Sequence, residues 1–184
     1  ANNIVSAEQT AALLDGLQAK SKLPLLLAVD EEGGTVARVG PKLGTTTLEP
    51  MFSYRSEGVD TAYANAKALA DDISALGFNV DLAPVADVWT NPQNTVIGGR
   101  AYSDKPAEAA ELVAAAVEGF HAGGVTATLK HFPGHGDTLE DSHDGSAYVS
   151  KTLAELENCE FLPFIAGIEA GAQLIMTGHI TLTA

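Results

Sequence analysis

The chain has little cysteine and little positive charge. Among 184 residues there is one cysteine, and ten basic residues stand against 24 acidic ones. Cys159, alone, excludes an intramolecular disulfide and a thiolate metal cluster, and its helical surroundings indicate an inert, partly buried thiol. The formal net charge of -14 argues against a nucleic-acid partner, because a polyanion would be repelled and no Lys/Arg cluster offsets the balance.

Long apolar runs are also missing. No segment approaches the roughly 18–20 apolar residues of a membrane span, and no signal peptide opens the chain. The chain begins at Ala1 without Met, so compartment stays open between the cell envelope or exterior and the cytoplasm. A hydrophobic content of 46% with 18% charged residues is typical of a globular protein. Without a low-complexity linker, we expect residues 1–184 to form one domain.

Helical and strand patterns alternate four times along the chain. We expect helices at about 7–19 and 61–76, from just after Pro106 to before Gly123, and from 152 to 171; we expect strands at 24–29, 78–83, 125–129 and 173–177. The first strand reads as fully buried. Capping boxes at Ser6/Gln9 and Thr152/Glu155 mark two helix starts, and Pro163 is expected to kink or split the last helix. This alternation predicts parallel βα units with right-handed crossovers.

Unusual polar residues gather at the ends of these strands, where parallel α/β folds bind ligands. They are Asp30-Glu31-Glu32, Asp87, Lys130-His131 and His179. Long loops at about 31–59, 85–105 and 131–151 also follow strands, which favours a (β/α)8-type barrel over a flavodoxin-like open sheet. A complete barrel needs eight strands in about 250 residues. Four strands predict a partial barrel, unless the sheet is open.

The loop from Lys130 to His143 has the densest titratable chemistry of the chain. In a tight loop the Asp141 carboxylate can accept the Nδ1–H of His143, which leaves Nε2 free to exchange a proton with a substrate. The bland alternative is an Asx turn at Asp141 beside a solvated histidine. A metal site is a further alternative, because His131, His135, His143 and Asp137 could supply ligands, but no HExxH or similar spacing supports it.

Four more residues suit a polar, neutral ligand such as a sugar. Lys130 and His131 should emerge at the rim as hydrogen-bond donors, although the lysine could simply pair with a carboxylate. Asp30 could accept two sugar hydroxyls or cap the following turn. Arg100, in a loop, could give a ligand a fork of hydrogen bonds or pair with an acidic residue. No phosphate-binding glycine motif is present.

Together these segments resemble the N-terminal barrel domain of family 3 glycoside hydrolases, in its β-N-acetylglucosaminidase branch. The match is carried by 28–38 (AVDEEGGTVAR), 81–88 (DLAPVADV), 96–100 (VIGGR) and 130–143 (KHFPGHGDTLEDSH), with a weaker fifth stretch at 175–180 (IMTGHI). The KHFPGHG loop that ends in Asp-Ser-His is the most specific of them. The matches follow the family's order over nearly the whole chain.

The resemblance implies roles for the matching positions. Asp30, Arg100, Lys130 and His131 would hold the N-acetylglucosamine ring at the point of cleavage. His143, oriented by Asp141, would be the acid/base in place of the usual glutamate. Cleavage would retain configuration through a covalent glycosyl-enzyme intermediate. No metal or organic cofactor is implied.

Two departures from the family pattern stand out. Glu31 occupies a position where this branch usually has glutamine, which is expected to add a negative charge beside the sugar site. The family's nucleophilic aspartate follows a strand well downstream of His179, and the first barrel strand normally precedes residues 1–4. We therefore expect this chain to be part of a longer protein, inactive alone, and stable only with the remainder of the barrel, a partner segment or a second copy.

The resulting hypothesis is a retaining β-N-acetylglucosaminidase. The alternatives are a non-catalytic sugar-binding or scaffold protein of the same fold, and a β-glucosidase of the same broad family, against which the Asp-Ser-His loop argues. The natural substrate stays open among peptidoglycan fragments, chitin oligomers and glycoconjugates. So does phosphorolysis, since the same histidine loop would serve either acceptor.

Overall fold

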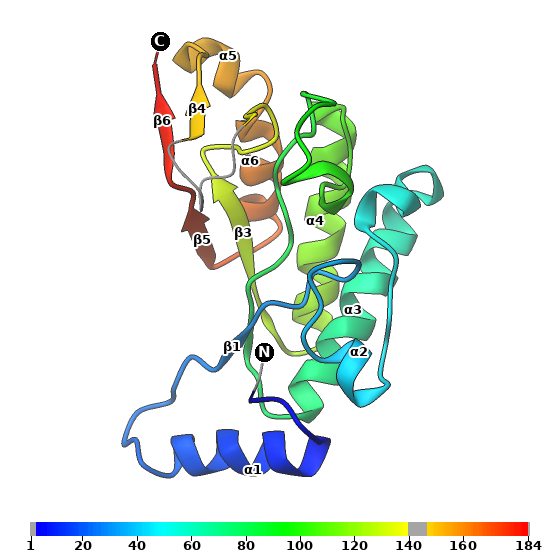
Figure 1. Cartoon of the computed structure of the whole chain (residues 1–184), viewed down its shortest axis with the longest axis vertical. Coiled ribbons are helices and arrows are strands. Elements are labelled where there is room, and N and C mark those ends of the chain that lie inside the picture. Colours follow the sequence, from blue (N-terminus) through cyan, green and yellow to red (C-terminus); the bar gives the residue numbers. More distant parts are fainter. Residues whose placement is uncertain (1–2, 140–146, 184) are drawn as a thin grey trace.

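The computed structural model describes residues 3–139 and 147–183 (Figure 1). The helices are α1 (Ala7–Gln18), α2 (Gly40–Leu43), α3 (Val59–Ala75), α4 (Pro106–Ala122), α5 (Leu153–Glu157) and α6 (Phe161–Glu169), with 3-10 helices η1 (Met51–Glu57) and η2 (Gly98–Arg100). The strands are β1 (Ala28–Val29), β2 (Val80–Asp81), β3 (Thr126–Phe132), β4 (Ala147–Val149), β5 (Leu174–Thr177) and β6 (Ile180–Leu182). None of the described helices is both long and apolar enough to cross a bilayer.

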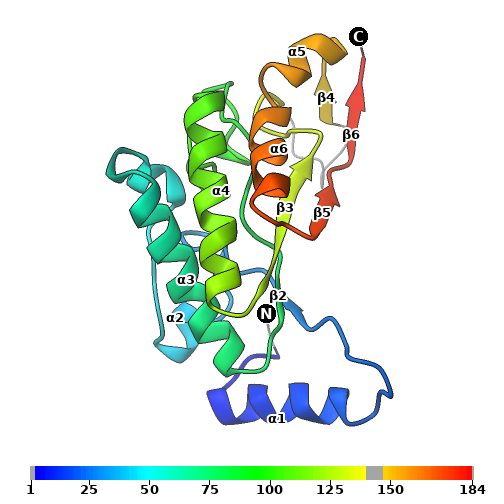
Figure 2. The same cartoon turned by 180° about the vertical axis from the view of Figure 1, so that it is seen from behind.

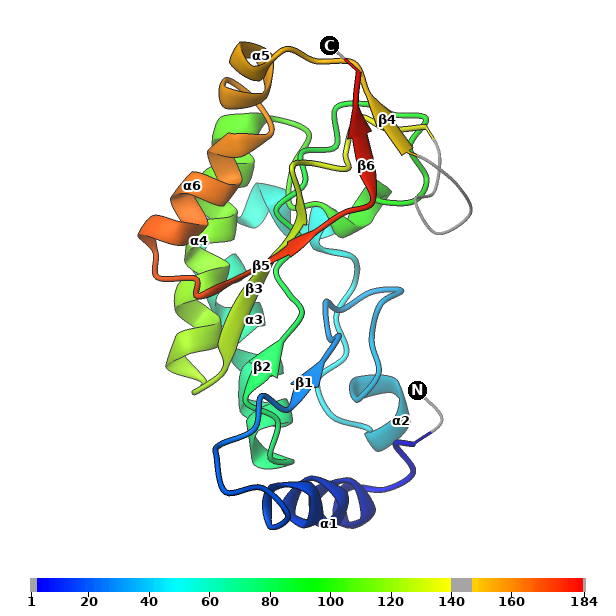
Figure 3. The same ribbon diagram turned by 90° about the vertical axis from the view of Figure 1, so that its left-hand side faces the viewer.

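The main sheet is parallel and its strands follow chain order. Its order is β1-β2-β3-β5, and each neighbouring pair is parallel. A doubly wound open sheet reverses strand order at a switch point, whereas barrel strands succeed one another in sequence. Helices α3, α4 and α6 lie on the same side of this sheet, as Figures 2 and 3 show. Both features are those of consecutive βα units of a barrel.

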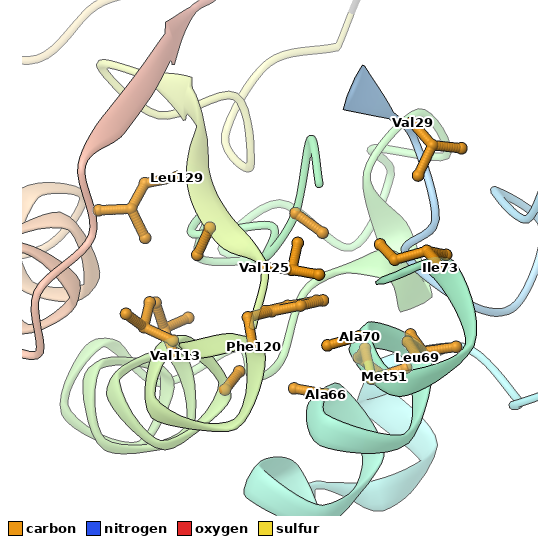
Figure 4. Packing of buried hydrophobic residues seen from close by; sticks show 14 of the residues in the cluster. Val29, Met51, Ala66, Leu69, Ala70, Ile73, Val113, Phe120, Val125 and Leu129 are labelled. Carbon is orange, nitrogen blue, oxygen red and sulfur yellow. The ribbon is translucent and has the colours of Figure 1, made fainter. Parts of the chain in front are cut away.

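The hydrophobic core lies between these helices and the sheet. Phe120 of α4 reaches towards Ala66 and Ala70 of α3, and all three are almost fully buried (Figure 4). A Cβ at Gly119 would lie 2.3 Å from the Tyr63 carbonyl oxygen, so glycine is needed where α4 meets α3. Small residues on both helices therefore allow α3 and α4 to pack closely together.

Helix boundaries agree well with the sequence expectations. Ser6 accepts a hydrogen bond from the backbone N–H of Gln9, although the Gln9 side chain accepts from Val5 N rather than from the cap itself. Thr152 and Glu155 form a complete capping box at α5. The predicted split is confirmed, because α5 ends at Glu157 and α6 begins at Phe161, with Pro163 in the first turn of α6, where its missing N–H costs no bond.

The expected buried strand at 24–29 is wrong in extent and in burial. Only Ala28–Val29 form a strand, and the Leu26 side chain is 73% exposed. Within the described part of the chain, β1 is paired on one side alone, with β2. With no strand described on its other side, Leu26 stays largely exposed, while Leu27 still packs against the core.

Two short strands were not predicted from the sequence. β4 and β6 pair in parallel, from Ala147 opposite Ile180 to Val149 opposite Leu182. β6 starts only three positions after β5 ends, and three residues are too few to show a period. The pair extends above the end of β3 in Figure 1, so it continues the rim at which the polar strand-end residues lie.

Candidate active site

The sequence-predicted sugar-holding residues meet at the carboxyl ends of the strands. Asp30 directly follows β1, Lys130 and His131 lie near the end of β3, and Arg100 ends η2 in the loop after β2. Lys130 Nζ lies 2.5 Å from Asp30 Oδ1. The Arg100 NH2 atom lies 3.5 Å from His131 Nε2. Four residues from three strand-end segments are thus brought into one cluster.

Glu32 is the centre of this cluster, although no role was predicted for it from the sequence. Arg100 donates to it twice, from Nε and NH2, each at 2.8 Å. Lys130 Nζ is 2.6 Å from the same carboxylate. Burial alone would raise the pKa of Glu32, but the hydrogen bonds from Arg100 and the charge of Lys130 outweigh it and lower that pKa below its usual value. Glu32 is two positions from Asp30, the spacing at which strand residues face the same side. This spacing could have predicted that Glu32 lies in the same cluster as Asp30.

Lys130 is the most deeply buried charge of the cluster. Its side chain is 1% exposed, and an ammonium in such a place is tolerated only when paired. Glu32 is buried with it, whereas the Asp30 side chain stays 31% exposed. Asp30 therefore has a carboxylate oxygen that solvent or a ligand can reach, while its other partner, Arg38, is 3.9 Å away.

His131 is oriented by a fully buried carboxylate. Its Nδ1 lies 2.7 Å from Asp87 Oδ2, and the backbone N–H groups of His131 and His135 donate to Asp87 Oδ1 at 3.2 and 2.7 Å. Burial would raise the pKa of Asp87, but the charge and hydrogen bond of His131 and the backbone N–H groups lower it. A proton on Nδ1 leaves Nε2 facing Arg100 and the cluster. Asp87 is thus an orienting residue.

The Glu31 side chain points to the start of α2. The side chain is 1% exposed and accepts hydrogen bonds from the backbone N–H groups of residues 38, 39 and 40 at 2.5, 2.7 and 3.1 Å. These N–H groups stand at the start of α2, where a negative charge is favoured. Glu31 is therefore a structural anchor for the turn before α2.

Asp81 is a second buried acid below the cluster. Its Oδ1 accepts from Glu31 N at 2.9 Å, and its Oδ2 has no hydrogen-bond partner among the described residues. Burial, and then the neighbouring charges of Asp30 and Glu31, raise the pKa of Asp81 well above its usual value.

The His135 loop is held by hydrogen bonds within the protein. His135 is 2% exposed, and its Nδ1 lies 2.6 Å from Thr138 Oγ1. Buried Asn94 donates to the His135 carbonyl oxygen at 2.7 Å and accepts from the N–H groups of residues 96 and 97. Among residues 3–139 and 147–183 no group of three His, Cys, Asp or Glu is arranged to hold a metal ion. His143, which the metal alternative also used, lies outside this range.

Asp141 and His143, the predicted proton-transfer pair, lie outside the described residues. Their flanking segments are joined by Lys151, which pairs with the buried Glu160 and lies 3.4 Å from Asp137 Oδ2. Asp137 also accepts from Thr90 Oγ1 at 2.8 Å. Lys151 and Glu160 were missed from the sequence because their pairing depends on how β4 and α5 return to the rim.

Cys159 is half-buried, as expected of an inert thiol. Burial, followed by the charge of Glu160, raises the pKa of the Cys159 thiol to about 11. A thiol with that pKa is protonated at neutral pH and is a poor nucleophile.

Comparisons with known proteins agree with this architecture. The model of the "Glycosyl hydrolase family 3 N terminal domain" matches residues 1–184. A beta-hexosaminidase of Xanthomonas axonopodis pv. citri is 38% identical over 97% of this chain and 54% of its own length, and beta-hexosaminidase A of Pseudoalteromonas piscicida is 39% identical over 100% of the chain and 32% of its own. The chain thus spans from about a third to just over a half of the length of these curated relatives.

Solved structures give the same result. A glycoside hydrolase family 3 beta-N-acetylglucosaminidase from Paenibacillus sp. superposes with a TM-score of 0.92 at 38% identity, over 98% of this chain and 35% of that one. NagZ from Neisseria gonorrhoeae, solved with N-trifluoroacetyl-D-glucosamine, gives a TM-score of 0.88 at 32% identity, over 96% of this chain and 53% of that one. The partial-barrel prediction is confirmed by these likenesses, and the chain belongs to glycosyl hydrolase family 3 as its N-terminal domain.

Proposed function

We propose that the protein containing this chain is a retaining β-N-acetylglucosaminidase. It would hydrolyse terminal N-acetylglucosamine from glycans or peptidoglycan fragments. The observation that carries the proposal is the cluster of Lys130, Glu32, Arg100 and Asp30, pre-organised at the carboxyl ends of the barrel strands. Relatives that are named beta-hexosaminidase or beta-N-acetylglucosaminidase match nearly the whole chain, which supports the assignment of substrate class.

The electrostatics of the cluster suit a neutral sugar. The two cations, Lys130 and Arg100, are balanced by two carboxylates, the buried Glu32 and the partly exposed Asp30. A ligand without charge is then recognised through directed hydrogen bonds: Asp30 accepts from hydroxyl groups, Lys130 and Arg100 donate, and His131, with its Nδ1 proton held by Asp87, accepts at Nε2. Because the donors are already fixed by their partners, little side-chain entropy is lost when the sugar binds.

The proton transfers would be performed by His143, oriented by Asp141. In the first step a carboxylate nucleophile, expected downstream of this chain, attacks the anomeric carbon while His143 gives a proton to the leaving oxygen. In the second step His143 removes a proton from water, which attacks the same carbon and releases the carboxylate. The 184-residue chain by itself is accordingly expected to be inactive.

Replacing the acid/base in the whole protein tests this mechanism. In His143→Ala, hydrolysis of N-acetyl-β-glucosaminides with alkyl leaving groups should fall by about two to four orders of magnitude, since general acid–base catalysis contributes that much. The loss should shrink for dinitrophenyl leaving groups, which depart without a proton. His121→Ala, at the last turn of the outer helix α4, is the matched control and should keep full activity. Near wild-type turnover of alkyl substrates in His143→Ala would refute the assigned role.

A further inference from the structure

A small aromatic hollow lies on the same rim, outside the cluster. It has a volume of about 240 Å³ and is lined by Phe52, Trp89, Thr90, Pro92 and Asp104. Its walls come from η1, from the loop after β2, and from the segment that leads into α4. Trp89 is the one tryptophan of the chain. The hydrogen bonds of the cluster involve none of these five residues.

The tryptophan is held rigidly in this hollow. Trp89 Nε1 donates to the Asn94 carbonyl oxygen at 3.1 Å, and its backbone N–H donates to the Ser103 carbonyl oxygen at 3.1 Å. The Phe52 and Trp89 rings meet edge-on, with centroids 5.0 Å apart and an interplanar angle of 80°. A ring fixed in this way offers a large contact area at little entropic cost.

The polar groups of the hollow are matched in charge. Arg55 NH1 lies 2.7 Å from Asp104 Oδ1, with both side chains more than a third exposed. The same guanidinium lies 4.3 Å from the centroid of the Phe52 ring. Thr90 gives its proton to Asp137, so its oxygen is left as an acceptor. Aromatic surface beside a neutralised ion pair and a hydroxyl fits a neutral, polyhydroxylated ring, which packs its C–H face on an aromatic ring and hydrogen-bonds at its edge.

The hollow adjoins the point where the terminal sugar would be held. Trp89 is two residues from Asp87, which orients His131, so their Cα atoms are at most about 7 Å apart. Thr90 donates a hydrogen bond to Asp137, which stands four positions before Asp141 in the chain. An enzyme that removes a terminal sugar has the rest of its substrate on the leaving-group side only. We propose that this hollow is a subsite for the second sugar residue of an oligosaccharide, with Trp89 as its stacking platform.

The subsite rests on the proposed function, and substrate choice separates the two. In the whole protein we compare chitobiose, which has a second sugar, with N-acetyl-β-glucosaminyl fluoride, which has none. Trp89→Ala should lower kcat/KM for chitobiose about tenfold and leave kcat/KM for the fluoride within about twofold, since tenfold corresponds to one lost stacking contact of about 1.4 kcal/mol. Tyr63→Ala, at a partly exposed aromatic on α3, is the control and should change neither.

Two further measurements cover a folding defect in Trp89→Ala. Asp104→Ala, at an exposed side chain, should also lower kcat/KM for chitobiose selectively. The tryptophan fluorescence change on adding chitobiose should be reduced in Trp89→Phe. Equal losses for chitobiose and fluoride, or no selective loss for chitobiose in either variant, would overturn the subsite. An enzyme that hydrolyses neither substrate would instead refute the proposed function.

Discussion

Lys130 is the residue on which the cluster depends, because a charge that is 1% exposed is stable only beside its counter-ions. Glu32 serves both Lys130 and Arg100, and it is buried itself. The fork of Arg100 on Glu32 fixes the position of the guanidinium in the plane of the carboxylate. At this scale, the site is a set of charges whose positions are decided by one glutamate.

Glu32→Gln should therefore damage both folding and the site. Removing one partner of a buried pair costs about 3–5 kcal/mol, so we expect urea unfolding of the whole protein to show a loss of that order. Asp71→Asn, which breaks the exposed pair with Lys67, is the control and should cost at most about 1 kcal/mol. Similar losses in the two variants would contradict the central role of Glu32.

The same substitution should flatten the acid limb of stability. The pKa of Glu32 is lowered from 4.5 in the folded protein, so its contribution is present above that value and is lost as pH falls through the lower folded pKa. The free energy of unfolding of the wild type should thus decline more steeply below pH 4.5 than that of Glu32→Gln. The measurement is a series of urea unfolding curves between about pH 6 and pH 3.

How far the residues could be predicted from sequence is clear in Asp30-Glu31-Glu32. Three acids at a strand end indicated a polar rim, and the rim is there. The different partners of these acids could not be predicted, because Glu31 turns towards the N–H groups at the start of α2, whereas Glu32 turns towards Lys130 and Arg100. Both partners of Glu32 lie far away in the chain, so no local pattern reports them.

At the scale of elements, two loops interlock behind the rim. A Cβ on Gly136 would lie 1.8 Å from the Val88 carbonyl oxygen, and Gly136 O accepts from Asn91 N at 3.2 Å. The loop after β2 and the loop after β3 therefore touch backbone to backbone. Helices with caps and proline stops were predictable, because those signals are local. The contact between the two loops was not predictable, since it joins segments 48 residues apart in the chain. The prediction that 24–29 is buried was wrong for a related reason, because the burial of a strand depends on its neighbouring strand.

Gly136→Ala should separate these two loops. The Val88 carbonyl group belongs to the backbone and cannot move aside by changing rotamer, so we expect the free energy of unfolding to fall by about 1–3 kcal/mol. Turnover should also fall, because both loops carry residues of the site. Gly16→Ala makes the same change inside α1, where a Cβ meets nothing within 4 Å, and should stabilise by about 0.5–1 kcal/mol. Thermal unfolding of the two variants measures the contrast, and a shift of the same sign in both would contradict the interlock.

At the scale of the molecule, the sheet has two open sides. Within the described residues β1 pairs only with β2, and β5 pairs only with β3. An apolar hollow of about 400 Å³ lies beside β1, lined by leucines of α1 and of the segment before the strand. Large apolar side chains such as Leu26 and Ile175 are 73% and 43% exposed. Unpaired strand edges beside apolar surface favour association with another chain.

The isolated 184-residue chain should consequently self-associate or bind its missing neighbours. Its net charge of -14 opposes contact between copies, so raising the salt concentration should screen that repulsion and increase association. We expect sedimentation velocity to show concentration-dependent species larger than 19.0 kDa, and the double variant Leu26→Asp/Ile175→Asp to reduce them, because a charge at each open side makes burial there costly. A tightly packed monomer at all concentrations and salt levels would show that the half-barrel closes its own edges, and the need for a partner would then be wrong.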